Sequence, residues 1–353
     1  MRATIFEAPG TVSVVDRATP QPGPGELRLR MAAASLCASD VRVYRGEKYA
    51  KAGVIPGHEI AGVVDAIGPG AGEVSDRTIK EGDRVVICPV VACGQCRFCL
   101  IGRQNRCVSR KTLGYDLDGG FAEQLLVPAE LVRVGHVLPV PKNLPLDIAA
   151  LTEPAACTLN SLELCEVGAG SSLLILGAGP MGLLHLILGR ALGAGPIIVS
   201  EPVAERREIA TRWGADLVLD PTTQDVQAAV KDATSGYGAD AVVVTVGVHA
   251  MVTPAIDLVR KQGVINLFAG FPPNQTVPFD PNIIHYGEII LSGSQNATTD
   301  QYRKTLNLLG QVPHIDEVVT NRYDIEHAPE AYSSRLAMNG LKSLVQFSGV
   351  DSA

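Results

Sequence analysis

The sequence carries no excess of positive charge and no long apolar run. Its 30 Lys and Arg are outnumbered by 37 Asp and Glu, which gives a formal net charge of −7. Nucleic acids and anionic membrane surfaces are bound by clustered cations, so we expect neither as a partner. No stretch approaches the roughly 18 apolar residues that cross a bilayer, and the first residues do not resemble a signal peptide. These absences favour a cytoplasmic protein that acts on small molecules.

The length indicates two domains, because 353 residues exceed one ordinary core and 46% apolar residues suffice for two. Up to about Leu138, short runs of β-forming residues are broken by Gly and Pro, which predicts an all-β, barrel-like domain. The strands expected there span residues 11–15, 26–31, 60–67, 83–88 and 121–127. A helix is expected from about residue 146, and the domain boundary is expected near Glu153.

From Glu153 onward, apolar strands alternate with helices. The expected strands span residues 172–176, 196–200, 217–219, 241–246, 263–267 and 288–291, and the expected helices span 180–192 and 204–213. This alternation predicts an α/β domain whose parallel sheet is covered on both faces. The C-terminal part returns to one helix, 301–309, and to short mixed elements that end at 343–347.

Four of the eight cysteines are spaced like the ligands of a structural metal site. Cys93, Cys96 and Cys99 recur at every third position, and Cys107 follows on the returning chain. Thiolates in this arrangement can converge on one zinc ion, and closed all-sulfur coordination serves structure rather than catalysis. The alternatives are four unrelated buried thiols or a disulfide, and the reducing cytosol disfavours a disulfide.

A glycine-rich turn follows the first strand of the second domain and opens its first helix. Its G-x-G-x-x-G pattern places the N-terminus of that helix against a pyrophosphate. The pattern alone could be an ordinary tight turn, but its place after a buried strand favours a dinucleotide site. The expected coenzyme contacts are Gly177, Gly179, Pro180, Met181, Gly182, Glu201 and Arg206.

Glu201 closes the next strand, where a carboxylate can accept hydrogen bonds from both hydroxyls of the adenosine ribose. The same carboxylate repels a 2′-phosphate, which favours NAD over NADP. Arg206 and Arg207 follow on the next helix, where they could offset that repulsion or simply form a solvated face.

Several motifs stand in the order found in one enzyme family. They are Cys37-Ala-Ser39-Asp40, Gly57-His58-Glu59, the cysteine cluster, Glu153-Pro154 and the glycine-rich turn. In that order they resemble the zinc-dependent medium-chain dehydrogenases of the alcohol dehydrogenase superfamily, most closely the sorbitol or polyol dehydrogenase branch. The resemblance implies a GroES-like β-barrel catalytic domain, residues 1–153 and 294–353, and a doubly wound Rossmann NAD-binding domain, residues 154–293. It also implies a homodimer or homotetramer.

The resemblance further implies a catalytic zinc ion. A thiolate, an imidazole and a carboxylate that leave one position open suit such a site, although these residues alone could be a coincidence. In the polyol branch the residues matching Cys37, His58 and Glu59 bind zinc, and the one matching Glu153 lies beside the metal. Glu59 and Glu153 remain alternatives for one position, directly or through water. We therefore expect two zinc ions per chain, the second held by Cys93, Cys96, Cys99 and Cys107.

Ser39 and Arg42 bear on the path of the substrate proton. Ser39 matches a hydroxyl that passes the proton outward in the family, and alone it reads equally as a turn-capping serine. Arg42 stands where many relatives carry a relay histidine, and an arginine, with a pKa of roughly 12.5 or more, cannot act as a base in water. Either the proton leaves by another route, or Arg42 binds a coenzyme phosphate or a substrate anion.

The sequence departs from the polyol branch at Gln295 and Asn296, where Arg-Tyr is common. Amides suit several hydroxyl groups, so these two residues, with Ser39 and Glu153, are the expected substrate contacts. The predicted activity is hydride transfer between NAD and a secondary alcohol of a polyol, cyclitol or aminocyclitol. The alternatives are an L-threonine 3-dehydrogenase and a simple alcohol dehydrogenase. The catalytic zinc motif disfavours a zinc-free reductase and a non-catalytic zinc scaffold.

Overall fold

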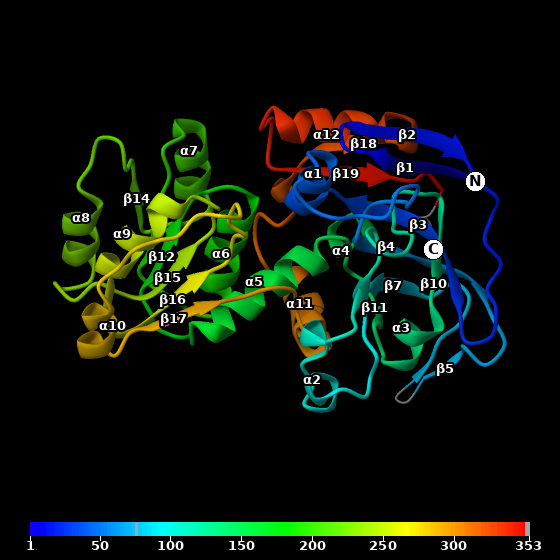
Figure 1. The fold of residues 1–353 in the computed structure, drawn as a ribbon, viewed down its shortest axis with the longest axis horizontal. Helices are drawn as coiled ribbons and strands as arrows, with labels where there is room; N and C mark the ends of the chain where they lie inside the picture. Colours follow the sequence, from blue (N-terminus) through cyan, green and yellow to red (C-terminus); the bar gives the residue numbers. More distant parts are fainter. Residues whose placement is uncertain (75–76, 350–353) are drawn as a thin grey trace. The chain divides into compact units, whose positions relative to one another are not determined.

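The computed structural model describes residues 1–74 and 77–349, which form two compact units (Figure 1). Unit 1 comprises Met1–Ala156, Ala297–Gln311 and Val319–Ala353, and unit 2 comprises Cys157–Asn296 and Val312–Val318. The boundaries expected after residues 153 and 293 each lie three residues before those of the structure.

The segment Val312–Val318 was expected in the first domain, but it packs on unit 2. His314 stacks on Trp213 with ring centroids 5.6 Å apart. Glu317 accepts hydrogen bonds from the Arg212 guanidinium at 2.6 Å and from the Trp213 indole at 3.3 Å. These partners lie 104 and 105 positions away in the sequence, so no local pattern reveals the contact.

Unit 1 is built on a mostly antiparallel seven-stranded sheet in the order β11-β7-β4-β3-β19-β18, with β10 paired to β3. The strands are β3 (Leu27–Ser35), β4 (Glu59–Ile67), β7 (Arg84–Ile87), β10 (Gln124–Val127), β11 (Val137–Pro139), β18 (Val319–Tyr323) and β19 (Lys342–Gln346). Three short pairs are β1 (Arg2–Ala8) with β2 (Thr11–Asp16), β5 (Glu73–Val74) with β6 (Arg77–Thr78), and β8 (Val90–Val91) with β9 (Lys111–Thr112).

The helices of unit 1 are short and lie between or beside these strands. They are α1 (Ala38–Tyr44), α2 (Arg97–Leu100), α3 (Ala129–Arg133), α4 (Leu146–Ala149), α11 (Thr299–Leu309) and α12 (Ala328–Leu336), with 3₁₀ turns η1 (Gln104–Arg106) and η4 (Ile325–His327). Helix α5 (Thr152–Leu164) begins in unit 1 and continues into unit 2.

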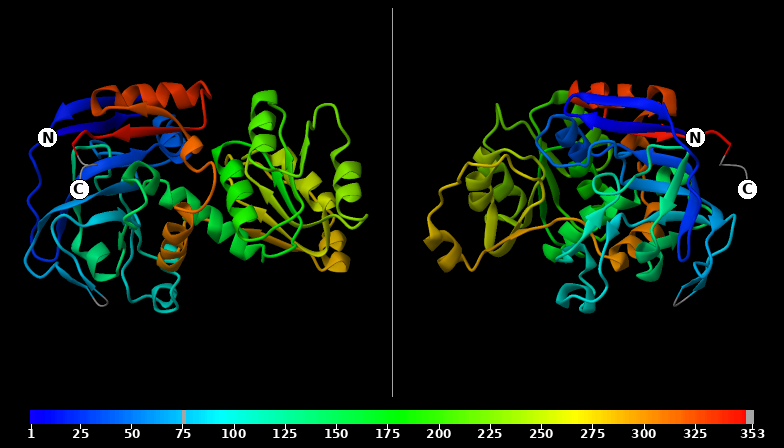
Figure 2. Two further views of the ribbon diagram at one scale, coloured as in Figure 1. Left: turned by 180° about the vertical axis from the view of Figure 1, so that it is seen from behind. Right: turned by 45° about the vertical axis from the view of Figure 1, so that its right-hand side comes forward.

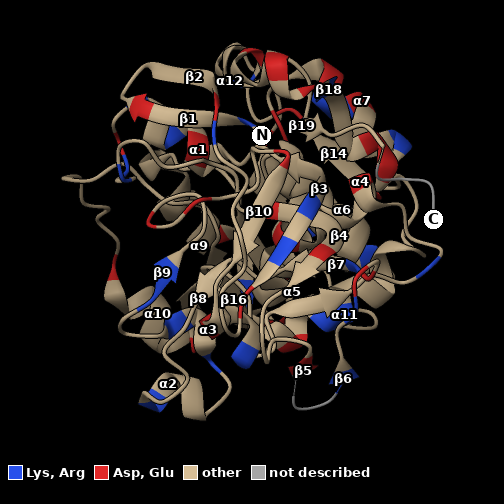
Figure 3. Ribbon diagram, turned by 90° about the vertical axis from the view of Figure 1, so that its right-hand side faces the viewer, with Lys and Arg blue, Asp and Glu red and all other residues tan. Residues whose placement is uncertain are grey.

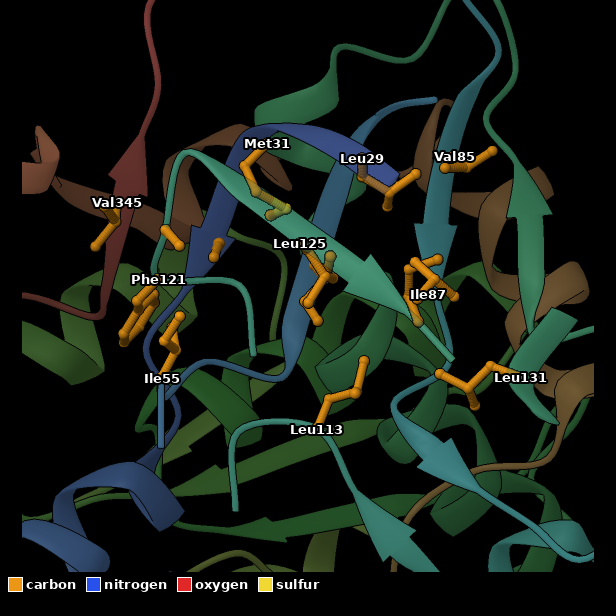
Figure 4. Close-up of a cluster of buried hydrophobic side chains, with 14 of the residues drawn as sticks. Leu29, Met31, Ile55, Val85, Ile87, Leu113, Phe121, Leu125, Leu131 and Val345 are labelled. Atoms are coloured by element: carbon orange, nitrogen blue, oxygen red, sulfur yellow. The ribbon is translucent and has the colours of Figure 1, made fainter. Parts of the chain in front are cut away.

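The core of unit 1 follows from alternation along its strands. On β3, Leu29 and Met31 are fully buried, whereas Arg30 between them is exposed. They share one core with Ile87 of β7 and Leu125 of β10, as Figure 4 shows. Each such side chain contributes about 1.5 to 3 kcal/mol when it is removed from water. This packed sheet gives β3 and β4 fixed positions.

The all-β prediction for this part of the chain did not include helix α1. Residues Ala38–Tyr44 form this helix directly after Cys37, which is its N-cap. The strand expected at 121–127 begins only at Gln124, because Phe121 leaves the sheet and is fully buried in the core.

Unit 2 confirms the doubly wound α/β fold. Its six strands are all parallel in the order β14-β13-β12-β15-β16-β17, and Figure 2 shows helices on both faces of the sheet. The strands are β12 (Leu173–Leu176), β13 (Ile197–Ser200), β14 (Leu217–Leu219), β15 (Ala239–Val244), β16 (Val259–Leu267) and β17 (Ile290–Gly293). The helices are α6 (Pro180–Ala191), α7 (Ala204–Arg212), α8 (Val226–Ala233), α9 (Val252–Leu258) and α10 (Pro281–Gly287), with 3₁₀ turns η2 (His249–Met251) and η3 (Asp316–Val318).

Two further observations concern membrane spans and the distribution of charge. Among the described residues, no helix is both long and apolar enough to span a bilayer. In the view of Figure 3, basic and acidic positions are interspersed along the ribbon. The net charge of −7 therefore does not come from one acidic segment.

His185 predicts a loss of stability in mild acid. It is fully buried in α6, where its Nδ1 donates to the carbonyl of Met181 at 2.7 Å and its ring lies edge-on to Phe268. Burial lowers its pKa to about 4, against roughly 6.5 in an unfolded chain. The unfolded state therefore takes up the proton first, so stability is complete above pH 6.5 and falls as the pH approaches 4.

We expect urea titrations between pH 7 and pH 4.5 to show this loss for the wild type and a shallower loss for His185→Leu. A change of pKa by one unit corresponds to about 1.4 kcal/mol, so the contribution of His185 is a few kcal/mol at most. His285→Leu is the matched control, because His285 is exposed and should leave the slope unchanged. Equal slopes in wild type and His185→Leu would contradict the assignment.

Candidate functional site

Cys37, His58 and Glu59 come together where β3 ends and β4 begins. These strands pair so that Ser35 lies opposite Glu59, which brings Cys37, just beyond β3, beside the start of β4. One ligand atom from each of the three residues lies within 4.8 Å of the others. His58 is 5% exposed and Glu59 is fully buried. The structure thus groups three of the residues expected at a catalytic zinc.

The turn that presents His58 requires glycine at position 57. Gly57 has a φ of +91°, which residues with a Cβ rarely adopt, and a Cβ there would lie 2.8 Å from the Phe121 ring. Glycine at position 57 therefore fixes the backbone conformation of the turn against the Phe121 ring. This conformation sets the direction in which His58 points at the start of β4.

Asp40 orients two members of the group. One of its carboxylate oxygens accepts a hydrogen bond from the backbone N–H of Cys37 at 2.9 Å, and the other lies 3.3 Å from Nδ1 of His58. Burial lowers the pKa of His58, but Asp40 and Cys37 outweigh it and raise that pKa well above its usual value. With Nδ1 facing Asp40, Nε2 is the ring nitrogen available to a metal.

Glu59 has a charged partner that the sequence did not predict. Nζ of Lys342 on β19 donates to both carboxylate oxygens of Glu59, at 2.7 and 2.6 Å, and both side chains are buried. Each carboxylate oxygen has a further lone pair, so the lysine neutralises Glu59 without blocking it as a ligand. A buried pair of this kind is costly to break, because the remaining charge would have no partner.

Glu153 lies near the start of α5 and is 9% exposed. Burial raises the pKa of Cys88 to about 12 and raises that of Tyr115, and the charge of Glu153 adds to both effects. Glu153 therefore lies in the same region as Tyr115, whose ring centroid is 5.1 Å from that of His58. The group of ligand atoms within 4.8 Å does not include Glu153.

Ser39 and Arg42 lie on α1 and face different partners. Oγ of Ser39 lies 2.6 Å from the Tyr115 hydroxyl and 3.5 Å from Nε2 of His58. Nε of Arg42 lies 3.7 Å from the carboxylate of Glu47. Ser39 is thus part of the site, whereas Arg42 has a carboxylate partner on its own segment.

These donors fit a zinc ion. Thiolate, imidazole and carboxylate are the ligand types that zinc takes in proteins, and catalytic sites use three of them with one open position. The hydrogen bond to Cys37 and the Asp40 contact of His58 are the kind of supporting interactions that orient ligands.

The second group of sulfur atoms also fits one zinc ion. A tetrahedron with Zn–S bonds of about 2.3 Å places its sulfurs about 3.8 Å apart. The Sγ atom of Cys99 lies 3.9 Å from that of Cys93 and 3.5 Å from that of Cys96. Cys107 completes the group within 4.8 Å, and its sulfur accepts from the N–H of Cys93 at 3.3 Å. All eight cysteines are free thiols in the structure.

The glycine-rich turn in unit 2 has the geometry of a phosphate site. Gly177 follows β12 with a φ of +105°, and Gly179 is the N-cap of α6 with no side-chain cap. A Cβ at Gly182 would lie 1.8 Å from the carbonyl oxygen of Gly177, so only glycine lets the helix approach the turn. The backbone N–H groups that follow Pro180 in the first turn of α6 are thus available to an anion.

Glu201 is held against this turn. Its carboxylate accepts from the N–H of Ala178 at 2.6 Å and from that of Val203 at 2.9 Å, and it is 3% exposed. Arg207 donates to the carbonyl of Glu201 and forms an ion pair with Asp220, which follows β14. Arg206 forms no ion pair or hydrogen bond among the described residues. Of the two arginines, only Arg206 is available to a ligand.

The expected substrate residues are divided between the units. Ser39 and Glu153 belong to unit 1, and Gln295 and Asn296 belong to unit 2, on the segment after β17. Asn296 has a φ of +55°, and its carbonyl accepts from the Asn160 side chain at 2.9 Å. That hydrogen bond fixes the backbone of the segment.

Comparisons with known proteins agree with this geometry. Residues 23–141 match the alcohol dehydrogenase GroES-like domain family, and residues 180–311 match the zinc-binding dehydrogenase family. The L-threonine 3-dehydrogenase of Pyrococcus furiosus is 34% identical over 316 residues, which cover 88% of this chain and 87% of that protein. This chain belongs to the zinc-dependent medium-chain dehydrogenases.

Other members of the family align almost end to end. The L-galactonate-5-dehydrogenase of Escherichia coli K12 is 29% identical over 98% of this chain and 99% of its own length. The crystal structure of a zinc-binding dehydrogenase from Sinorhizobium meliloti 1021, bound to NADP, superposes with a TM-score of 0.90 at 30% identity and covers 98% of this chain and 99% of that one. The chain is therefore an alcohol dehydrogenase-type oxidoreductase, and the GroES-like and Rossmann fold class is confirmed.

Four residues of the site were missed by sequence reasoning in whole or in part. Asp40 stands three positions after Cys37, the spacing of a capping box, which was a usable signal. Lys342 and Tyr115 lie 283 and 76 positions from the residues they contact, so no spacing rule identifies them. Lys48, whose Nζ lies 3.8 Å from the centroid of the Tyr115 ring, belongs to none of the motifs described above.

Proposed function

We propose that this dehydrogenase transfers a hydride between NAD and a secondary alcohol of a polyol, cyclitol or aminocyclitol. The observation that carries the proposal is the cluster of Cys37, His58 and Glu59, with the Ser39 hydroxyl beside His58. The glycine-rich turn at the start of α6 supports the coenzyme part.

In the forward reaction, the carbinol carbon gives up a hydride with two electrons to C4 of the nicotinamide, and the hydroxyl gives up its proton. The products are a ketone, the reduced coenzyme and one proton. A zinc ion at this site would polarise the substrate hydroxyl and lower its pKa. Ser39 and Tyr115 form a hydroxyl pair that can carry the substrate proton away from the site, and Asp40 holds the His58 imidazole in place.

We further propose one zinc ion at the cysteine cluster and one at the cluster of Cys37, His58 and Glu59. The sulfur separations and the N–H donors of the first cluster support the structural assignment. Metal analysis of the purified protein tests it, with about two zinc ions expected per chain. One zinc ion per chain would favour a scaffold with a structural site alone.

The substrate class is tested by oxidation of a panel with NAD, followed by absorbance of the reduced coenzyme. Polyols, cyclitols, aminocyclitols and L-threonine form the panel. Turnover of a polyol, cyclitol or aminocyclitol above L-threonine supports the proposal. The second candidate is an L-threonine 3-dehydrogenase, favoured by the Pyrococcus relative, and preferential turnover of L-threonine would select it.

Glu201 is expected to set the coenzyme preference. Glu201→Ala should weaken NAD binding and admit NADP, because the carboxylate that repels a 2′-phosphate is removed. A loss of charge-assisted hydrogen bonds of about 1 to 3 kcal/mol predicts a change in the NAD to NADP ratio of kcat/KM of roughly 5- to 150-fold. Because the same carboxylate ties down Ala178, thermal unfolding of the variant must accompany the kinetics.

The double variant Glu201→Ala with Arg206→Ala separates the two causes. If Arg206 is the residue that takes up the 2′-phosphate, the NADP activity gained in the single variant should be lost in the double one. Arg207→Ala is a poor control, since Arg207 already pairs with Asp220 at 3.0 Å. An unchanged coenzyme ratio in Glu201→Ala would place the selection elsewhere.

A further inference from the structure

Lys48 places a positive charge beside the site, and no carboxylate among the described residues forms an ion pair with it. It lies in the segment between α1 and β4, and its Nζ stands 3.8 Å from the centroid of the Tyr115 ring. Lys48 is an exposed residue. Among the described residues its side chain forms no hydrogen bond or ion pair, and its one polar interaction is with the Tyr115 ring. The attraction between an ammonium and an aromatic face contributes about 0.5 to 2 kcal/mol. This contact uses none of the three N–H donors of the ammonium for a hydrogen bond.

Tyr115 connects this charge to the site. Its hydroxyl lies 2.6 Å from Oγ of Ser39, and its ring lies 5.1 Å from that of His58. Lys48 is exposed as a residue, but partial desolvation of its ammonium lowers its pKa, and the charges of Cys37 and two carboxylates act against that effect. Lys48 is therefore one aromatic ring away from the hydroxyl pair that would meet the substrate.

The segment that carries Lys48 is anchored without using its side chain. The backbone N–H of Lys51 donates to the carbonyl of Tyr115 at 2.8 Å, and that of Glu47 donates to the carbonyl of Arg42 at 2.8 Å. Because the backbone is held on both sides of Lys48, the ammonium is not needed to fix the loop.

Two acidic groups of the site, Asp40 and Glu59, have other partners. Asp40 accepts from the N–H of Cys37 and faces His58, and Glu59 is neutralised by Lys342. The charge of Cys37 would be matched by the metal it helps to bind. A cation without its own anion, next to a substrate hydroxyl site, is the arrangement that binds a carboxylate or phosphate.

We propose that Lys48 binds an anionic group of the substrate, so that the alcohol oxidised here is a hydroxy acid or a phosphorylated polyol rather than a neutral sugar alcohol. The proposal rests on the dehydrogenase function proposed above and narrows its substrate class. Carboxylate and phosphate share the chemistry that Lys48 recognises, and the experiment distinguishes them.

The test compares zinc-loaded wild type with Lys48→Met, using NAD and four kinds of alcohol. These are an aldonate, L-threonine, a polyol phosphate and a neutral polyol. Methionine keeps an unbranched stem over the Tyr115 ring and removes the charge. We expect the wild type to prefer one anionic alcohol, and the ratio of its kcat/KM to that of the neutral polyol to fall by about 10- to 100-fold in Lys48→Met, mainly through KM. Lys48→Arg should restore most of the preference.

Lys51→Met is the matched control. Lys51 stands on the same segment, but its side chain lines a separate hollow with Arg17 and Asp118, so all ratios should stay as in the wild type. A second readout uses inorganic phosphate, which should inhibit the wild type in competition with the anionic alcohol and inhibit Lys48→Met more weakly.

Three results would overturn the proposal. They are a wild-type preference for the neutral polyol, an unchanged preference in Lys48→Met, and a rise in KM for NAD in place of the alcohol. Absence of turnover with every alcohol would contradict the dehydrogenase function itself, whereas turnover of neutral polyols alone contradicts only the role of Lys48.

Discussion

Replacement of Cys37 by serine is expected to lower kcat by at least about 1000-fold, a loss of about 4 kcal/mol of transition-state stabilisation. Serine is a far poorer zinc ligand than a thiolate, so the zinc content should fall from about two ions to about one per chain. The fold should survive, because serine is a preferred N-cap and α1 begins directly after this residue. Steady-state kinetics, metal analysis and circular dichroism on one preparation check the three outcomes.

The control for this variant is Cys165→Ala. Cys165 is a buried thiol outside both clusters, so its removal should leave kcat and both zinc ions in place. Full activity of Cys37→Ser with one zinc ion would show that the cluster of Cys37, His58 and Glu59 is not the catalytic centre. Loss of the cysteine-cluster zinc instead would show that the two sites are coupled through the fold.

The residues of the site that were predictable are those with a local motif. Cys37, His58 and Glu59 were found because each stands in a short pattern at a strand end, and the register of β3 against β4 then joins them. The partners Lys342 and Tyr115 were not predictable, since their contacts depend on how distant strands and loops pack.

Arg42 shows how a sequence position differs from a place in space. It stands where many relatives carry a relay histidine, but in the structure its Nε faces Glu47, while Ser39 on the same helix meets the Tyr115 hydroxyl. A proton path that leaves through Tyr115 needs no imidazole at position 42. Of the two alternatives that the sequence left open for Arg42, these contacts favour the one in which the proton leaves by another route.

The fold was predictable where apolar runs were continuous. In unit 2 the strand at residues 217–219 was predicted with its observed limits, and β12 and β13 were predicted to within one residue. Helices α8, α9 and α10 were missed because they are only seven or eight residues long. β17 starts two residues late because Glu288 adopts a left-handed conformation at the end of α10.

The cysteine cluster gives the second large prediction, since little besides the metal would hold its segment. Only Ala92, Cys99 and Cys107 are buried there as an apolar group, while Leu100 is 74% and Ile101 is 64% exposed. So small a core cannot offset the conformational entropy of ordering the segment from Cys93 to Cys107. A zinc ion bound by four thiolates contributes its binding free energy directly to folding, and in small zinc domains this exceeds roughly 10 kcal/mol.

Cys99→Ser should therefore lower stability by several kcal/mol locally and leave the zinc ion at Cys37 in place. Hydrogen exchange should become fast in residues 92–113 and stay slow in β3 and β4, and the fraction that remains folded should keep its kcat. Arg97→Ala, an exposed change on the same helix, should do neither. Normal protection of residues 92–113 combined with a lost kcat would reverse the roles of the two clusters, because a closed sulfur site that governs turnover cannot be a purely structural one.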